Sequence, residues 1–318
     1  MKNSVSIVIP NWNGKELLAK NLPSVLHAAE KIRPLLKEII VVDDGSTDGS
    51  VSFLEQRFPS VTICPLSRNQ GFHRATNIGF TKSCGDIVIL LNSDIEPHPD
   101  AFPPLVEHFS DPALFGVNGR IYAADKRSFL YGNRGALFKK GHFYLLEKKE
   151  FDSSQNLFVC GGAGAFSRQR FLNLGGFDTL FYPFYYEEQD ISYRALKRGW
   201  KIAYDPRSIM YHQVRGTIGK KMPAKKVGYI SARNNYLFVC KNITDPRYTL
   251  SFLLYVPLFL LRDLLRGRMR FWIAFFMALP RLPRAAYKRI KEQRYHSVSD
   301  REILLRTLPQ DYNRNSNL

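Results

Sequence analysis

The sequence predicts an α/β fold in which a mainly parallel sheet is flanked by helices, with a basic amphipathic helical extension at the C-terminus. Short β-branched apolar runs alternate with segments of helical periodicity, which is typical of parallel strands joined by helices. The net charge is +18, and residues 213–318, with 21 basic and six acidic side chains, carry most of it. A chain of 318 residues, 45% of them hydrophobic, can form one large domain and a smaller appendage. We therefore expect a main domain over residues 1–240 and a basic, aromatic-rich helical tail over 241–318.

Four strands and three helices are expected in the first hundred residues. The strands are the apolar runs 5–10, 38–44, 61–66 and 86–92. The helices are 14–30, which Pro23 is expected to interrupt, 50–58 and 73–83. Such a series builds an open parallel sheet, and open parallel sheets bind ligands beyond the carboxyl ends of their strands.

Polar side chains follow three of these strands. They are Asn11 and Asn13 after the first strand, Asp43 and Asp44 after the second, and Asn92 and Asp94 after the fourth. Because parallel strands end at one edge of the sheet, these side chains should line one crevice. A carboxylate such as Asp94 needs a cation or hydrogen-bond donors there, and a hard divalent metal bridging a diphosphate would meet that need. The alternatives are that Asp94 caps the turn before Pro97 and that residues 43–48 form an ordinary Asp/Gly/Ser turn.

Five segments resemble a known family in their order and spacing. They are VSIVIPNWNG, VVDDGSTDGS, NQGFHRATNIG, ILLNSDIEP and the stretch from GGAGAFSRQRF to SIMYH. Over roughly residues 4–240 the chain is similar to glycosyltransferase family 2, and particularly to its bacterial rhamnosyltransferase-like branch, which builds cell-surface polysaccharides. The resemblance implies the GT-A fold, a Rossmann-like α/β domain, and inverting transfer of a sugar from a nucleotide sugar.

The resemblance also implies a donor site in the crevice. Its residues would be Pro10, Asn11, Asn13, Asp43, Asp44, Gly71, Arg74, Asn77, Asn92, Ser93 and Gly162. The carboxylate of Asp43 can accept the imide N–H of uracil or thymine, and Arg74 can reach a diphosphate with its cationic fork. The alternatives are a solvated Arg74 and an Asn77 whose amide is satisfied inside the protein.

A divalent metal, Mg²⁺ or Mn²⁺, is the cofactor that the resemblance implies. Asn92 and Asp94 occupy the family's metal-binding DxD position, with asparagine in place of the first aspartate, so Asp94 would be the principal carboxylate ligand. His212, at the end of the run SIMYH, would be a second ligand. Without the resemblance, a lone histidine after a strand would be read as structural.

The resemblance places the catalytic base at the start of a later helix. The family pattern E-D-x-D has its base at the second position, which is Glu188 here, and Glu187 or Asp190 could share the role. The helix N-terminus is expected to keep these carboxylates ionised. The alternative is that they only cap the helix. One or two of the aromatic residues Phe181, Tyr182 and Phe184 are expected near the acceptor.

The tail combines apolar runs with arginines, which predicts helices lying on an anionic membrane surface. The run from Leu250 to Leu261 is shorter than the roughly 20 residues needed to span a bilayer. Long aliphatic runs argue against nucleic acid as a partner. The competing interpretation is a helical pair packed on the protein or on a second subunit.

The N-terminal apolar run is too short for a signal sequence or a membrane span, and the four cysteines are scattered. We therefore expect a cytoplasmic enzyme, peripherally associated with the inner face of the cell membrane, and admit a homodimer.

The predicted function is inverting transfer of a sugar from a nucleoside-diphosphate sugar, either a dTDP-deoxysugar or a UDP-hexose. The acceptor would be a hydroxyl of a lipid-linked or cell-surface glycan. The alternative is a non-catalytic protein of the same fold that binds nucleotide sugars or glycans, because Asn92 and Glu188 depart from the usual motifs.

Overall fold

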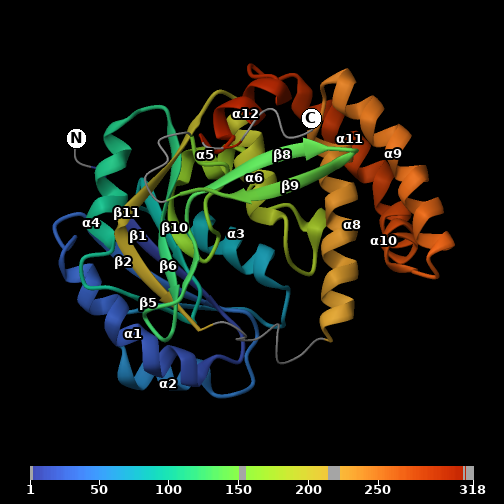
Figure 1. The fold of residues 1–318 in the computed structure, drawn as a ribbon. Helices are drawn as coiled ribbons and strands as arrows, with labels where there is room; N and C mark the ends of the chain where they lie inside the picture. Colours follow the sequence, from blue (N-terminus) through green and yellow to red (C-terminus); the bar gives the residue numbers. More distant parts are fainter. Residues whose placement is uncertain (1–2, 150–154, 214–222, 311, 313–318) are drawn as a thin grey trace.

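The computed structural model describes residues 3–149, 155–213, 223–310 and 312, and its centre is one nine-stranded sheet (Figure 1). The strand order is β3-β2-β1-β4-β10-β6-β11-β5, and β7 pairs with β6 outside this path. The strands of the first half are β1 (Val5–Asn11), β2 (Leu36–Asp43), β3 (Thr62–Pro65) and β4 (Ile87–Leu91). These four strands pair in parallel, so the predicted strands and their common direction are confirmed.

Three helices cover the two faces of these strands: α1 (Lys15–Glu30), α2 (Ser50–Arg57) and α3 (Phe72–Lys82). Successive residues of β1 enter opposite cores, because side chains of a strand alternate: Ile7 lies in the core of α1, and Val8 in that of α3. The expected interruption at Pro23 is wrong, since α1 continues through it. Pro23 and Ala19, whose carbonyl loses its partner, both face solvent, so water can satisfy the freed oxygen.

The second half of the sheet adds antiparallel strands to the parallel ones. Its strands are β5 (Ile95–Pro97), β6 (Leu114–Ala123), β7 (Phe129–Tyr131), β10 (Ala163–Ser167) and β11 (Lys201–His212). Its helices are α4 (Phe102–Glu107), η1 (His108–Ser110), α5 (Arg168–Asn173), η2 (Thr179–Phe181) and α6 (Glu187–Lys197). Strand β10 runs antiparallel to both β4 and β6, with Ala163 opposite Leu91. The segment that precedes β10 therefore reaches the carboxyl end of β4.

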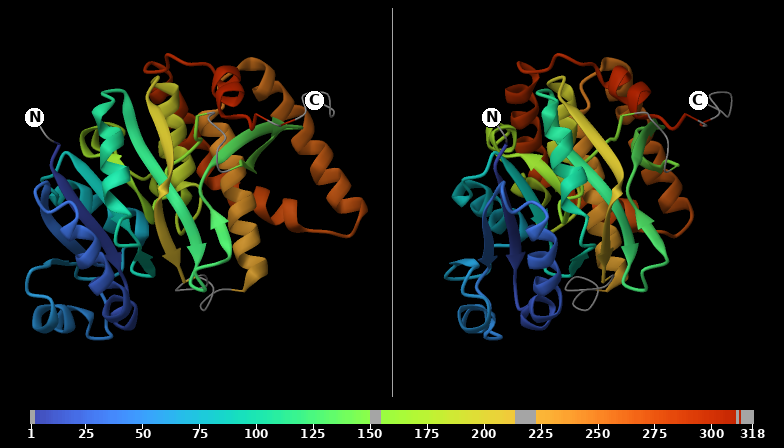
Figure 2. Two further views of the ribbon diagram at one scale, coloured as in Figure 1. Left: turned by 60° about the vertical axis from the view of Figure 1, so that its left-hand side comes forward. Right: turned by 90° about the vertical axis from the view of Figure 1, so that its left-hand side faces the viewer.

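A two-stranded sheet and the C-terminal helices complete the fold. The two strands are β8 (Arg134–Lys139) and β9 (His142–Glu147). The helices are α8 (Ala224–Asn242), α9 (Pro246–Leu265), α10 (Arg270–Ala278), η3 (Leu279–Arg281), α11 (Leu282–Gln293) and α12 (Asp300–Thr307). Helix α8 packs against β9, and α12 against β8. The N-terminal strands and the C-terminal helices lie at opposite ends of the molecule (Figure 2).

The tail shares its core with the main domain. Leu260 of α9, Ala274 of α10 and Ala285 of α11 belong to the same buried cluster as Phe238 of α8. Helix α8 itself runs through residue 240, so the division at 240/241 stays a prediction about units and does not coincide with the end of an element. At 20 residues, α9 is long and apolar enough to cross a bilayer, and the expectation of a shorter run is corrected.

Buried ion pairs join α6 to the tail. Lys241 of α8 lies 2.7 Å from Asp178 Oδ2 and 2.6 Å from Asp190 Oδ1, and Lys288 of α11 lies 2.9 Å from Asp178 Oδ2. Arg194 completes the set, 2.9 Å from Asp190 Oδ2. Lys241 and Lys288 lower the pKa of Asp178 against the opposing effect of burial. Each charge has a partner, which is the condition for burying it.

Candidate active site

Asp43 ties together the loops that follow β1 and β2. Its side chain accepts hydrogen bonds from Asn11 Nδ2 at 2.9 Å and from the backbone nitrogen of Ser46 at 2.9 Å. Asn13 joins the same turn, because its backbone nitrogen donates to Ser46 Oγ at 2.8 Å and its Oδ1 accepts from the backbone nitrogen of Thr47 at 2.8 Å. Three predicted donor-site residues are therefore brought together, in a turn that is also well ordered by itself.

Asp44 holds the loop that leads into α3. Its two oxygens accept hydrogen bonds from the backbone nitrogens of Gln70 at 2.7 Å and Gly71 at 2.8 Å. Burial raises the pKa of Asp44 despite these donors. Gly71 has a φ of 87°, and a Cβ there would come within 2.7 Å of Tyr182 Cε2. The close approach that Gly71 permits in this structure is thus to an aromatic ring.

Asp94 and His212 meet at the end of β4, as the sequence predicts. Asp94 Oδ2 lies 3.3 Å from His212 Nε2, and Asp94 Oδ1 is buried without a hydrogen-bond partner in the described part of the chain. Tyr131 OH lies 3.1 Å from His212 Nδ1 and so turns Nε2 toward the carboxylate. One carboxylate and one imidazole fit Mg²⁺ or Mn²⁺, with other ligands from water and a diphosphate. No group of three His, Cys, Asp or Glu side chains suited to a metal occurs among the described residues.

Asn92 is held against the segment that precedes β10. Its backbone nitrogen donates to Gly162 O at 2.9 Å, and a Cβ on Gly162 would come within 2.3 Å of Asn92 Nδ2. The next residue, Ser93, is fixed from the other side, because its carbonyl oxygen accepts a hydrogen bond from Asn21 Nδ2 at 2.9 Å. Pro10 lies buried in the neighbouring strand β1, opposite Val42 of β2. Glycine at 162 is therefore needed for the DxD segment to occupy its place.

Glu188 lies beside the same segment, at the start of α6. A Cβ on Gly161 would be 3.0 Å from Glu188 Oε1. Burial, followed by the neighbouring Glu187 carboxylate, raises the pKa of Glu188 to about 8. The expectation that the helix N-terminus keeps this group ionised is therefore wrong at neutral pH, because burial and a like charge outweigh the helix dipole.

Tyr131 interacts electrostatically with both Asp94 and Glu188. Burial raises its pKa, and so do the neighbouring Cys160, Glu188 and Asp94. The Asp94–His212 pair and the carboxyl group of Glu188 therefore both lie near Tyr131. Glu188, whose pKa is raised to about 8, is well placed for general-base catalysis near neutrality.

Glu187 faces the interior beneath the crevice. It is 5% exposed, and its Oε2 lies 3.5 Å from Nε2 of the equally buried His73 in α3. Neither this oxygen nor the two ring nitrogens of His73 has a hydrogen-bond partner within the described ranges. In this arrangement Glu187 influences the site by its charge on Glu188.

Asp190 lies in the ion network of α6 and the tail. It is fully buried, and Arg194, Lys241 and Asn242 occupy both of its oxygens. Neither oxygen is free to accept a proton from an acceptor hydroxyl, so these contacts argue against Asp190 as the base.

The surroundings of Asn77 and Arg74 match the alternatives to donor binding, which are an internally satisfied amide for Asn77 and a solvated side chain for Arg74. Asn77 Nδ2 donates to Phe177 O at 2.9 Å, and Asn77 Oδ1 accepts from Phe177 N at 2.8 Å, so its amide is satisfied internally. Arg74 is exposed on α3 and lines a pocket with residues of the tail. Donor binding by these two side chains stays a prediction.

Several residues of this site carry no signal in the sequence. Tyr131 follows an ordinary loop, and only the antiparallel pairing of β7 with β6 brings it to His212. Cys160 and Gly161 precede the recognised Gly162, but their contact with Glu188 depends on the fold. Of the aromatic candidates, Phe181 and Phe184 are buried, and Tyr182 is 45% exposed.

The chain matches the sequence model of one protein family over more than half of its length. The model of glycosyl transferase family 2 matches residues 6–175, more than half of the sequence. The chain belongs to glycosyl transferase family 2. This membership agrees with the order of strand ends, DxD position and acidic helix start described above.

Relatives in this family share the first part of the chain. An undecaprenyl-phosphate 4-deoxy-4-formamido-L-arabinose transferase of Pectobacterium atrosepticum is 39% identical over 112 residues, 34% of this chain and 34% of the relative. The protein of the same name from Pseudomonas fluorescens is 40% identical over 107 residues, 32% of this chain and 31% of the relative. The alignment spans about a third of the length of these curated relatives.

Solved structures support the GT-A fold. GalNAc-T7, crystallised with UDP, GalNAc and Mn²⁺, has a TM-score of 0.60 and 20% identity, covering 79% of this chain and 49% of its own. The mannosyltransferase PcManGT of Pyrobaculum calidifontis, in complex with GDP-Man and Mn²⁺, has a TM-score of 0.55 and 16% identity, covering 91% of this chain and 88% of its own. The predicted fold class is thereby confirmed, and these neighbours show that the fold accommodates a nucleotide sugar and a divalent metal.

Proposed function

We propose that this protein is an inverting, metal-dependent glycosyltransferase that moves a sugar from a nucleoside-diphosphate sugar to a hydroxyl of a lipid-linked glycan. The observation that carries the proposal is the shared site of Glu188 and the Asp94–His212 pair, joined by Gly161 and Gly162. An acid–base group and a metal-binding pair in one crevice are what sugar transfer from a diphosphate requires. The donor follows the resemblance: a dTDP-deoxysugar, with a UDP-hexose as the runner-up.

Each part of the site has a role in the proposed reaction. Asn11, Asp43 and the turn after β2 bind the nucleoside, and Asp43 accepts the imide N–H of the base. Glu188, once deprotonated, takes the proton of the attacking hydroxyl, and the new glycosidic bond forms as the bond to the diphosphate breaks. This single displacement inverts the anomeric centre, so no covalent sugar–enzyme intermediate is required.

Asp94 and His212 would hold the divalent metal. When bound, the metal supplies positive charge to the leaving diphosphate. Tyr131 keeps His212 oriented, and Asn92 offers an amide oxygen at the rim. The unpaired Oδ1 of Asp94 supports this assignment, because a buried carboxylate oxygen without a donor is costly.

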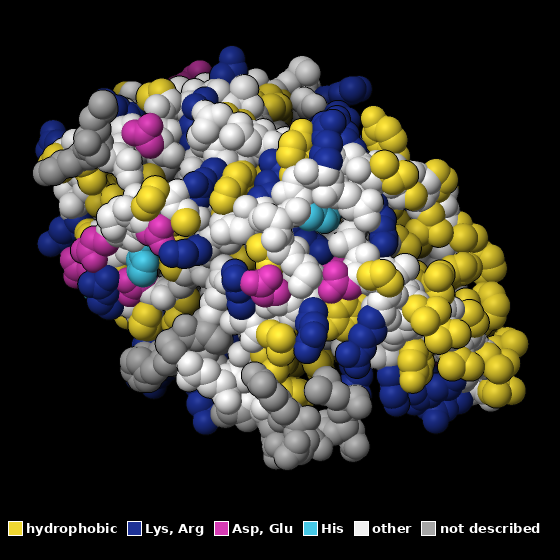
Figure 3. Space-filling view, turned by 90° about the horizontal axis from the view of Figure 1, so that it is seen from above, with side chains coloured by type: hydrophobic (Ala, Val, Ile, Leu, Met, Phe, Trp, Pro, Cys, Tyr) yellow, Lys and Arg dark blue, Asp and Glu magenta, His cyan; other side chains and the backbone are white. Residues whose placement is uncertain are grey.

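The lipid-linked acceptor is supported by the names of the relatives and by the surface of the tail. The two relatives described above are named for undecaprenyl phosphate. Helix α9 exposes one row of leucines: Leu250, Leu253, Leu254, Leu258, Leu261, Leu264 and Leu265. Seen from above, hydrophobic side chains gather at the end formed by α9 and α10, with Lys and Arg side chains at their border (Figure 3).

We propose peripheral attachment to the inner face of the cell membrane through this leucine surface. Val256 and Leu260 of α9 are buried against the protein, and Trp272 Nε1 donates to Leu260 O at 2.9 Å. A helix with these contacts lies on the protein with one face outward, as an interfacial helix does. Of the arginines in the tail, Arg281 and Arg289 donate to backbone oxygens, while Arg262, Arg266, Arg268 and Arg270 are exposed near the α9–α10 turn.

The proposal is tested by donor hydrolysis with the pure protein. We expect a panel of nucleotide sugars to show one dTDP- or UDP-sugar that is hydrolysed only with Mg²⁺ or Mn²⁺, and Glu188→Gln to lower that rate by about 10² to 10⁴. NMR of the product formed with an acceptor should show inversion at the anomeric carbon. Tight donor binding without turnover would instead identify the non-catalytic binding protein.

A further inference from the structure

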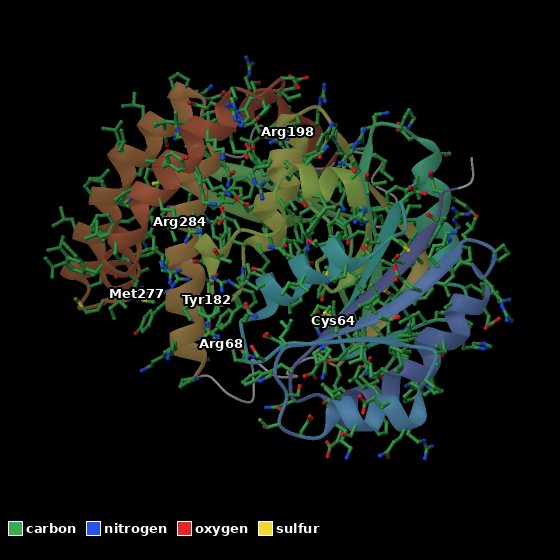
Figure 4. The ribbon with its side chains drawn as sticks, turned by 180° about the vertical axis from the view of Figure 1, so that it is seen from behind. Cys64, Arg68, Tyr182, Arg198, Met277 and Arg284 are labelled. Carbon is green, nitrogen blue, oxygen red and sulfur yellow. The ribbon has the colours of Figure 1, made fainter. Side chains whose placement is uncertain are left out.

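A second pocket, of about 570 Å³, lies where the loop before α3 meets the C-terminal helices. Four arginines line it: Arg68 from the loop after β3, Arg74 from α3, Arg281 from η3 and Arg284 from α11. In the view from behind, Arg68, Tyr182 and Arg284 follow one another along the seam between the N-terminal half and the tail (Figure 4). No acidic side chain lines the pocket in the part of the chain that the structure describes.

The four guanidinium groups differ in what already binds them. Arg281 Nη1 donates to Leu180 O at 2.9 Å and to Tyr182 O at 2.8 Å, and Arg284 Nη2 donates to Thr179 Oγ1 at 3.0 Å. These contacts place two cations on one wall. Among the described residues, Arg68 and Arg74 on the other wall have neither an ion pair nor a hydrogen bond from their side chains.

The arrangement is repulsive in the absence of an anion. Burial and the neighbouring Arg284 lower the pKa of Arg281, and burial followed by Arg281 lowers the pKa of Arg233 to about 10. Arg284 Nη2 lies 4.0 Å from the carboxylate of Asp178, which is already paired with Lys241 and Lys288. Guanidinium forks that face one another across a pocket match the oxygens of a phosphate or diphosphate.

The surroundings of the pocket favour one source of that phosphate. Pro280 lines the pocket, and Leu279 and Phe276, 39% and 57% exposed, precede it at the end of α10. Helix α10 packs against α9, which carries the exposed leucines. On the other side, Gln70 and Gly71 of the loop bind Asp44 at the edge of the crevice. The pocket therefore lies between an apolar surface and the active site.

We propose that this pocket binds the phosphate or diphosphate head of a polyprenyl-linked acceptor, with the polyprenyl chain directed over Leu279 and Phe276. This inference rests on the proposed function, because it assigns the acceptor of the same reaction. Its chemistry is that of a phosphate bound by arginines at the boundary of a hydrocarbon layer.

The test is equilibrium binding by the full-length protein, with no requirement for turnover. The probe is a phosphatidylcholine vesicle containing a small fraction of polyprenyl phosphate, and binding is measured by flotation. We expect Arg68→Gln with Arg284→Gln to weaken this binding by about tenfold for each arginine, as loss of a charge-assisted contact does. Arg266→Gln with Arg268→Gln is the matched control: it removes the same charge from exposed arginines at the α9–α10 turn.

On vesicles of phosphatidylcholine and phosphatidylglycerol, the control pair should reduce binding as much as the pocket pair does, or more. On vesicles that contain polyprenyl phosphate, the control pair should reduce binding less than the pocket pair does. Equal losses for both pairs on both vesicles would mean general attraction to anionic lipid and would overturn the assignment. Inorganic pyrophosphate that binds as tightly as polyprenyl phosphate would identify a site for a free phosphate, which also overturns it.

Two further measurements keep the outcomes distinct. Arg74→Gln removes a side chain that makes no hydrogen bond or ion pair in the described ranges, so it reports on the pocket if the double variant is unstable. Donor hydrolysis by the unmodified protein tests the proposed function separately: its absence defeats that function, whereas unchanged binding by the pocket variants defeats only the acceptor site.

Discussion

Replacing Glu187 by glutamine should make the enzyme more active near neutral pH. Burial and the Glu187 carboxylate together raise the pKa of Glu188 to about 8, so only about a tenth of the base is ionised at pH 7. For donor hydrolysis, kcat/KM should therefore rise about tenfold between pH 7 and pH 9 in the unmodified protein. Removing the like charge should lower the pKa of Glu188 by about one unit and raise kcat/KM at pH 7 about fivefold.

The assay is a pH profile of kcat/KM, which reports the pKa values of the free enzyme. Glu55→Gln is the control, because Glu55 is an exposed glutamate of α2 outside the site. Its profile should match that of the unmodified protein. A Glu187→Gln profile that does not move, or that moves to higher pH, would refute the coupling of the two carboxylates.

The titration of Glu188 should also make the folding stability of the protein fall as pH rises. Because the folded-state pKa of Glu188 is raised, its favourable contribution is present at low pH and is lost as pH rises from its ordinary value of 4.5 through about 8. Glu188→Gln keeps the shape of the side chain without the ionisation. Its melting temperature relative to the unmodified protein should therefore increase with pH across that window, and a constant difference would contradict the buried-carboxyl interpretation.

Three further predictions concern the metal and the membrane. Asp94→Asn, or a chelator on the unmodified protein, should abolish donor hydrolysis, and Mn²⁺ or Mg²⁺ should restore it only after chelation; activity that survives chelation would contradict a metal at this site. Tyr131→Phe should raise the Mn²⁺ concentration for half-maximal activity by about 10- to 100-fold while leaving the rate at saturating Mn²⁺ much less affected, because the phenol orients His212. Leu254→Gln with Leu258→Gln should reduce flotation with phosphatidylglycerol vesicles and leave the melting temperature nearly unchanged, because both side chains are more than half exposed, at 58% and 55%. A large loss of melting temperature would show that α9 packs on something else in solution.

The sequence predicts the N-terminal strands and helices well because their signals are local. Each parallel strand is one apolar run, and the polar residues that follow it, such as Asp43 and Asp94, must come to one edge. Their meeting depends only on strand direction, which alternating strands and helices determine. His212 is expected at this edge only from the family resemblance, and the structure places it 3.3 Å from Asp94.

The part of the site around β10 and α6 could not be derived in this way because its contacts are long-range. The antiparallel insertion of β10 places Gly161 beside Glu188 and Gly162 beside Asn92, and no periodicity shows where a strand inserts into a sheet. The acidic run EEQD likewise gives three candidates for a base. The structure distinguishes two of them: Asp190 is buried and paired with Lys241 and Arg194, whereas Glu188 lies beside Gly161.

The buried ion network limits how the parts of this protein can be exchanged during evolution. Asp178 and Asp190 belong to the segment around α6, while their partners Lys241 and Lys288 belong to α8 and α11. A recombinant that takes α6 from one relative and the C-terminal helices from another leaves charges buried without partners, which costs several kcal/mol for each. The helices that carry the leucine surface should therefore be inherited together with the segment around α6. Strands β1 to β4 make no ion pair with this network among the described residues, so they can diverge or be replaced without leaving these charges unpaired.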